Sequence, residues 1–131
     1  MLLGNILFLK ECKINLLFKK NLMEKLSETI LENANLWIES KQKVALATVI
    51  KTWGSSPCQI GSKMIINERG DFLGSVSGGC VEASVINECL ELMKKNNSFK
   101  KIHFTVQDEN AWSVGLACGG EITVFIEEIN S

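Results

Sequence analysis

The sequence has little excess charge of either sign, only one histidine, and no long apolar run. Fourteen basic residues stand against fifteen acidic ones, for a formal net charge of -1, so the positive surface that nucleic-acid binding requires is not expected. Every apolar run falls short of the roughly 18 residues that span a bilayer. A single histidine, His103, argues against a Ser-His-Asp triad. We therefore predict neither a nucleic-acid partner nor a membrane partner.

The cysteines lack the spacing of a zinc site or of a disulfide framework. Their number is odd, at five, and there is neither a Cys-x-x-Cys motif nor a cysteine–histidine pair at zinc-ligand spacing. We expect reduced thiols and hence a cytoplasmic location. The five positions are Cys12, Cys58, Cys80, Cys89 and Cys118.

The length of 131 residues accommodates one ordinary domain. Internal repeats, low-complexity tracts and linkers are missing from the sequence. The apolar segment at residues 1–10 resembles a weak targeting segment, but it has no basic region before it and no small-residue cleavage pattern, so we do not predict a signal peptide. We expect residues 1–22 to be a poorly ordered extension, with Met23 as the natural start, and residues 23–131 to form the domain.

Hydrophobic patterning predicts two helices and five strands. Apolar residues three and four positions apart predict helices over 23–41 and 81–95. Apolar or alternating runs predict strands, with a tight turn at Gly70 between the second and the third. This order implies a single α/β domain in which helices pack on a mixed β-sheet, with α+β as the alternative. The predicted strands cover residues 44–50, 64–66, 72–76, 101–106 and 121–126.

The glycines point to the functional part of the chain, because nine of the ten lie between Gly54 and Gly120. They form clusters at 54–61, 74–82 and 115–120. The second cluster joins a predicted strand to a predicted helix, where Gly78 and Gly79 allow close backbone approach and first-turn N–H groups favour an anion such as phosphate. Ser77 would add a hydroxyl donor. A simple tight turn with a small buried cysteine is an equal alternative, since no GxGxxG or P-loop pattern occurs.

Two cysteines each adjoin a glycine pair. Cys80 and Cys118 could meet on one side of the sheet and offer soft ligands to a thiophilic metal. The helix dipole favours a thiolate at Cys80, whereas Glu82 disfavours a second negative charge there, and the sequence leaves the balance open. The third cluster is equally consistent with a bulge or turn.

Other residues are weaker candidates. His103 falls on the outward face of its strand and is expected to face solvent, and Cys89 lies on an apolar helix stripe typical of a core. Trp53 and Trp112 flank glycine clusters and either cover a ligand or pack in the core. Asp108 belongs to a turn or adds an acidic group to the site.

Together these motifs resemble the XdhC/CoxI family, accessory proteins for xanthine dehydrogenase, carbon monoxide dehydrogenase and related molybdenum hydroxylases. The resemblance covers roughly residues 43–128 and is strongest in the Ser-Val-Ser-Gly-Gly-Cys-Val-Glu block at 75–82. It implies a maturation factor rather than an enzyme. Such a protein binds the molybdenum cofactor (molybdopterin), shields it, and helps deliver its sulfurated form to an apo molybdenum hydroxylase. The remaining motifs lie at 44–50, 54–57, 61–64, Asp108 and 115–120.

Within this resemblance we assign residue roles as a hypothesis. The phosphate or the pterin is expected at the Ser77, Gly78 and Gly79 turn, and Glu82 is expected to orient the loop or to hydrogen-bond the pterin. The cysteines would lie near the molybdenum as its ligands or protectors. The full predicted cofactor-binding set is Ser77, Gly78, Gly79, Cys80, Glu82, Cys118, Gly119 and Gly120, with Cys80 and Cys118 as metal ligands.

Two departures from the family and two alternatives complete the prediction. Cys58 stands where many relatives carry arginine. Many relatives also continue into a Rossmann-like domain, so either a separate chain supplies that domain or this protein does only part of the job. One alternative is a thiol-dependent sulfur-transfer or redox enzyme that uses Cys80 or Cys118 with a cysteine desulfurase as partner. The other is a purely structural docking module. A homodimer through an edge strand is also compatible with a small sheet domain.

Overall fold

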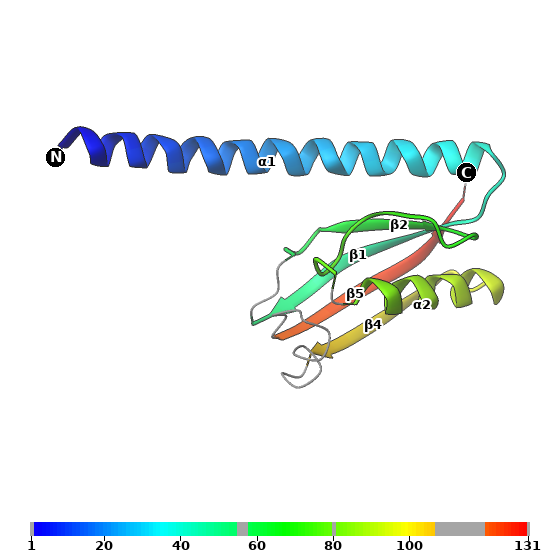
Figure 1. Cartoon of the computed structure of the whole chain (residues 1–131). Helices are drawn as coiled ribbons and strands as arrows, with labels where there is room; N and C mark the ends of the chain where they lie inside the picture. The colour runs from blue at the N-terminus through cyan, green and yellow to red at the C-terminus, as the bar shows by residue number, and fades with distance from the viewer. Residues whose placement is uncertain (1, 55–57, 80, 107–119, 131) are drawn as a thin grey trace.

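The computed structural model of the chain describes residues 2–54, 58–79, 81–106 and 120–130. These residues contain two helices and five strands, which are shown in Figure 1. In chain order they are α1 (Leu2–Glu39), β1 (Val44–Trp53), β2 (Lys63–Asn67), β3 (Phe72–Gly74), α2 (Glu82–Lys94), β4 (Phe99–Val106) and β5 (Gly120–Ile129).

The strands form one sheet in the order β3-β2-β1-β5-β4. The predicted single domain with helices packed on a sheet is confirmed. We expected a mixture of strand directions, but the four pairings among the described strands are all antiparallel. The reason lies in the connections: a tight turn at Gly70 joins β2 to β3, and the α2 crossover links β3 to β4 at opposite edges of the sheet. A helical crossover makes a parallel pair only when the strands that it joins are neighbours.

The larger core lies between the sheet and α2. Every second residue of β1 (Ala45, Ala47 and Val49) is fully buried on this face. The predicted apolar stripe of the second helix is confirmed, because α2 and the residue before it bury four of its members against these strands. These members are Val81, Val85, Cys89 and Leu92.

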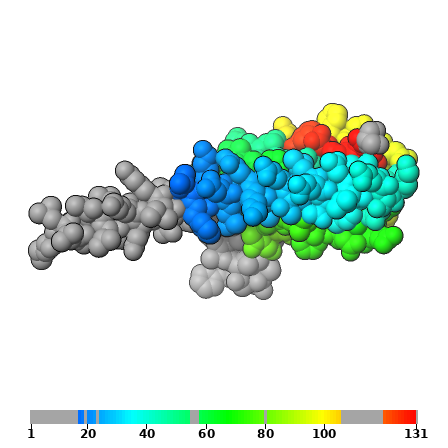
Figure 2. Space-filling model, turned by 90° about the horizontal axis from the view of Figure 1, so that it is seen from above, coloured from blue at the N-terminus to red at the C-terminus, as the bar shows by residue number. Residues whose placement is uncertain are grey.

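A smaller core lies on the opposite face, under α1. Ile30 and Ala34 of α1 pack on Val44 of β1 and Ile65 of β2. β1 is therefore covered on both faces, as its continuous apolar run at residues 44–50 indicates. Figure 2 looks down on α1 and shows β5, in red, emerging beside the helix. The main contacts of α1 are with β1, β2 and β3, so this helix packs mainly on one half of the face.

α1 contains the predicted helix 23–41 but begins much earlier, at Leu2. It therefore includes most of the segment that the sequence analysis set apart as an extension. The division of the chain at residue 22 stays a prediction. No helix among the described residues is both long enough and apolar enough to cross a membrane.

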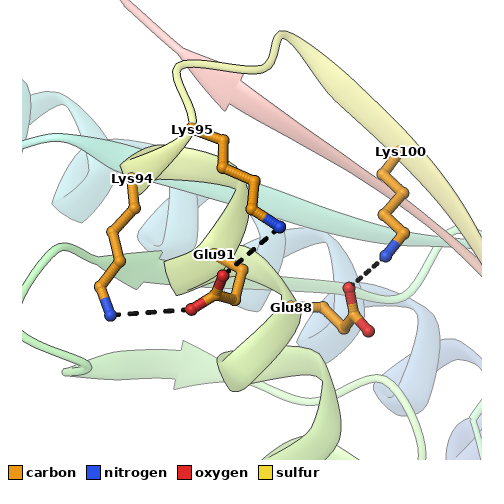
Figure 3. Close-up of polar contacts among 5 residues, drawn as sticks. All are labelled: Glu88, Glu91, Lys94, Lys95 and Lys100. Carbon is orange, nitrogen blue, oxygen red and sulfur yellow. Dashed lines mark hydrogen bonds and ion pairs between the residues drawn. The ribbon is translucent and has the colours of Figure 1, made fainter.

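A cluster of charged side chains covers the outer surface of α2 and the start of β4 (Figure 3). Glu91 lies 3.6 Å from Lys95, as the sequence spacing predicts, and 3.7 Å from Lys94. Glu88 pairs with Lys100 of β4. These opposite charges are paired at the solvent-exposed surface. Exposed pairs of this kind contribute at most about 1 kcal/mol each to the free energy of unfolding. We therefore regard this cluster as a solvated surface.

Candidate functional site

The loop between β3 and α2 is folded around the carboxylate of Glu82, the first residue of α2. One carboxylate oxygen accepts hydrogen bonds from the Ser75 hydroxyl at 2.6 Å and from the backbone N–H groups of Val76 at 3.2 Å and Ser77 at 2.9 Å. The other oxygen accepts a hydrogen bond from the Ser77 hydroxyl at 2.6 Å. Glu82 therefore fixes the path of the loop, which is one of the two roles predicted for it.

The two serine hydroxyls extend this network to the rest of the loop. The Ser75 hydroxyl oxygen accepts a hydrogen bond from the N–H of Gly78, and the Ser77 hydroxyl oxygen accepts one from the N–H of Val81, both at 2.9 Å. Ser77 is 3% exposed and donates its only hydroxyl proton to Glu82. The expectation that Ser77 offers a hydroxyl donor to a ligand is therefore corrected, because this donor is already engaged inside the loop.

The network also determines the protonation of Glu82. Partial burial raises the pKa of this carboxyl, but the hydrogen bonds from Ser75 and Ser77 outweigh burial and lower the pKa from 4.5 to about 2. Donors directed at an ionised carboxylate stabilise its charged form. Glu82 is therefore the internal anion of the junction, and its carboxylate binds the N–H of Ser77 in the turn where the sequence placed the phosphate or the pterin.

The depressed pKa of Glu82 predicts a pH dependence of stability. Because the folded-state pKa of about 2 lies below the ordinary value of 4.5, the contribution of Glu82 is complete above about pH 5 and is lost as the pH falls from 4.5 towards 2. After allowance for solvent screening of a half-exposed group, we expect this contribution to be about 1–2 kcal/mol. Urea unfolding at pH 7 and pH 3 measures it. The difference in unfolding free energy between wild type and Glu82→Gln should shrink at pH 3, and an unchanged difference would contradict the assignment.

Gly78 and Gly79 form the exposed tip of this loop. Both have positive φ, at 73° and 115°, a conformation that L side chains rarely adopt. A Cβ at Gly79 would have nothing within 4 Å, so the tip faces open space. The N–H of Gly78 is bound to Ser75. The N–H of Gly79 has no hydrogen-bond partner among the described residues.

The structure thus brings four of the predicted site residues together: Ser77, Gly78, Gly79 and Glu82. Gly120 lies on a separate element, at the start of β5 opposite Val106, also with a positive φ of 115°. The other predicted site residues lie outside the described residues, so their placement and the metal-ligand assignment stay predictions. These are Cys80, Cys118 and Gly119, together with the weaker candidates Asp108 and Trp112.

The remaining candidates are placed away from this loop. Cys89 is completely buried, and burial raises the pKa of its thiol to about 12, so its predicted role in the core is confirmed. His103 is half-exposed, as expected of an outward-facing residue, and lies 2.9 Å from the Thr123 hydroxyl and 3.5 Å from Glu121. The side chain of Trp53 is exposed rather than part of the core.

Two features escaped the sequence analysis. Ser75 links Glu82 to Gly78, and its signal was the Ser-x-Ser spacing five to seven residues before a first-turn glutamate.

The second feature is a pocket of about 130 Å³ beneath α1. It escaped because its walls come from three segments distant in sequence, and α1 was expected only as a core helix. The pocket is lined by Leu26, Ser27, Ile30, Cys58, Gly61, Ser62, Lys63 and Ser75.

Comparison with known proteins supports the family resemblance that the sequence motifs indicate. The sequence profile of the XdhC and CoxI family matches residues 37–104, a range that runs from the end of α1 into β4 and includes the Glu82 loop. The chain belongs to the XdhC and CoxI family. The resemblance noted in the sequence is therefore confirmed.

Individual family relatives are longer than this chain. It is 33% identical over 104 residues to the molybdenum cofactor insertion chaperone PaoD of Escherichia coli, covering 79% of this chain and 32% of the relative. It is 29% identical over 93 residues to a Bacillus subtilis protein named as a probable xanthine dehydrogenase subunit, covering 70% and 28%. A crystal structure of a xanthine dehydrogenase from Bacillus halodurans matches 84% of this chain and 30% of that one, with a TM-score of 0.61 and 25% identity. The chain thus spans about a third of these proteins.

Proposed function

We propose that this chain is an accessory protein that binds the molybdenum cofactor and helps deliver it to a molybdenum hydroxylase. Family membership and the name of the relative PaoD, a molybdenum cofactor insertion chaperone, support this role over a catalytic one. The apo hydroxylase would be of the xanthine dehydrogenase or carbon monoxide dehydrogenase type. We place the protein in the cytoplasm, where a cysteine desulfurase would act with it.

The observation that carries this proposal is the exposed glycine tip of a loop that is hydrogen-bonded to the Glu82 carboxylate. A flat heterocycle needs a backbone surface without side chains, and the Gly78 and Gly79 tip supplies one. The N–H of Gly79 can donate to a ring oxygen or nitrogen. A preorganised tip of this kind loses little conformational entropy on binding.

The negative charge of Glu82 favours binding of an uncharged part of the cofactor at this tip. The sequence is compatible with either the phosphate or the pterin at this turn. The loop amides of Val76 and Ser77 are bound to the Glu82 carboxylate, and a second anion placed beside it is disfavoured. We therefore propose that the neutral pterin lies at Gly78 and Gly79. The bound cofactor would supply a thiophilic metal, for which Cys80 and Cys118 remain the proposed ligands.

Anaerobic cofactor retention through gel filtration tests this proposal. Wild type should retain molybdenum and pterin together, and Gly79→Asp should lose at least tenfold in affinity, because the new carboxylate fills and charges the tip. Gly61→Asp is the matched control, since Gly61 is also exposed, has a φ of 92° and has nothing within 4 Å of the position that a Cβ would take. Equal losses in both variants, or no retention by wild type, would overturn the proposed site.

A further inference from the structure

α1 is considerably longer than the sheet beneath it. A helix of 38 residues measures about 57 Å at 1.5 Å per residue, whereas a ten-residue strand such as β1 measures about 33 Å. The C-terminal part of α1 packs on the sheet through Ile30 and Ala34, and its N-terminal part extends past the sheet (Figure 1). Helices in water gain most of their stability from packing. The extended part therefore needs a packing surface beyond the one that the sheet provides.

An apolar ridge leads from the buried part of α1 onto its extended part. Ile30 is 2% exposed, and successive residues four positions earlier are 44% (Leu26), 55% (Leu22) and 65% (Phe18) exposed. Residues four apart lie next to each other on one face, and such rows are the ridges through which helices pack against helices. The packing ridge of α1 thus continues uncovered beyond the sheet.

The charges of α1 are divided between its two halves. Residues 2–22 contain four lysines and one glutamate, and residues 23–39 contain four glutamates and one lysine, so the halves carry +3 and −3. This arrangement opposes the dipole of the helix itself, which favours acidic residues at its start and basic residues at its end. The first turn has no acidic residue and the last turn has no basic one. An antiparallel copy of the same helix would match both halves.

We propose that two copies of this chain associate through α1, antiparallel and centred near Leu22. In this register Phe18 of one copy lies level with Leu26 of the other, so the apolar ridge is complementary to itself. The basic half of each helix then runs beside the acidic half of the other. Leu26 also lines the pocket of about 130 Å³, close in size to the roughly 150 Å³ cavity that accommodates benzene. The phenyl ring of Phe18 is therefore a suitable occupant for it.

Sedimentation equilibrium of the full 131-residue chain tests this interface. We expect a dimer whose dissociation constant rises at least tenfold in Leu22→Ser. Leu17→Ser is the matched control, because Leu17 is 62% exposed against 55% for Leu22 but lies five positions away, on a different side of the helix. Both side chains are exposed in the single chain, so helix content by circular dichroism at low concentration should be equal in the two variants. A monomeric wild type, or equal weakening by both substitutions, would overturn the proposal.

Three further measurements test the orientation of the two helices, the contribution of their charges, and a competing occupant of the apolar ridge. Zero-length carboxyl–amine cross-linking of mixed isotope-labelled copies should join lysines of residues 10–20 to glutamates of residues 24–39 across copies, and links between two N-terminal halves would contradict the antiparallel arrangement. Raising sodium chloride from about 0.05 to about 1 M should weaken the dimer, because salt screens the opposed charges. If instead the chain stays monomeric and sediments with phosphatidylglycerol vesicles in a Leu22-dependent manner, a membrane surface is the occupant and the proposal is wrong.

Discussion

Replacement of Gly74 by alanine is expected to lower the free energy of unfolding by about 2–5 kcal/mol. Gly74 ends β3 with a φ of 92°, where an L residue is strained by roughly 1–2 kcal/mol. A Cβ there would also collide with the backbone carbonyl oxygen of Lys63 and would lie 2.9 Å from Cδ1 of Ile30. Overpacking of this kind costs a further 1–3 kcal/mol or so. Because small domains are stable by only about 5–15 kcal/mol in total, urea unfolding should detect this change readily.

Gly61→Ala separates the strain of the backbone from the collision. Gly61 has the same φ of 92°, but a Cβ there would have nothing within 4 Å. Its replacement should therefore cost only about 1–2 kcal/mol. Equal losses in the two variants would show that the close approach of β3 to Lys63 and α1 is not what requires glycine at position 74.

Replacement of Glu82 by glutamine is expected to lower the free energy of unfolding by about 2–3 kcal/mol at pH 7. Glutamine keeps the shape of the side chain, but its amide nitrogen cannot accept a hydrogen bond. At least one of the donors from Ser75, Val76 and Ser77 is then left without its acceptor. Hydrogen bonds to charged groups contribute roughly 1.5–3 kcal/mol, and an unsatisfied donor adds to the loss. Hydrogen exchange of the Val76 and Ser77 amides should also accelerate.

Glu88→Gln provides the control on the same helix. Glu88 pairs with Lys100 at the surface, where exposed ion pairs contribute less than about 1 kcal/mol. The Glu88 variant should therefore unfold nearly as wild type does. If both glutamates proved equally dispensable, the loop would not depend on the carboxylate network, and the rigidity on which the proposed pterin site rests would be lost.

Most of the secondary structure was predictable because its signal is local. The apolar stripe of α2, the alternation of β4 and the turn at Gly70 each depend on residues a few positions apart. Strand directions were not predictable in the same way. They follow from which strands are neighbours in the sheet, and α2 joins two strands, β3 and β4, that lie at opposite edges.

The candidate site likewise has features with a local sequence signal and features that depend on contacts between distant residues. The sequence by itself determined the family, the glycine tip at Gly78 and Gly79, and the presence of a glutamate in the first turn of α2, because these are motifs of contiguous residues. Only the tertiary structure decided what the polar groups of the loop do. When the chain turns back between β3 and α2, Glu82 comes within hydrogen-bonding distance of Ser75 and Ser77. Its carboxylate then accepts the N–H of Ser77, in the turn that the sequence suggested for an external anion. Competition between an internal and an external anion depends on distances in space, which residue order does not specify.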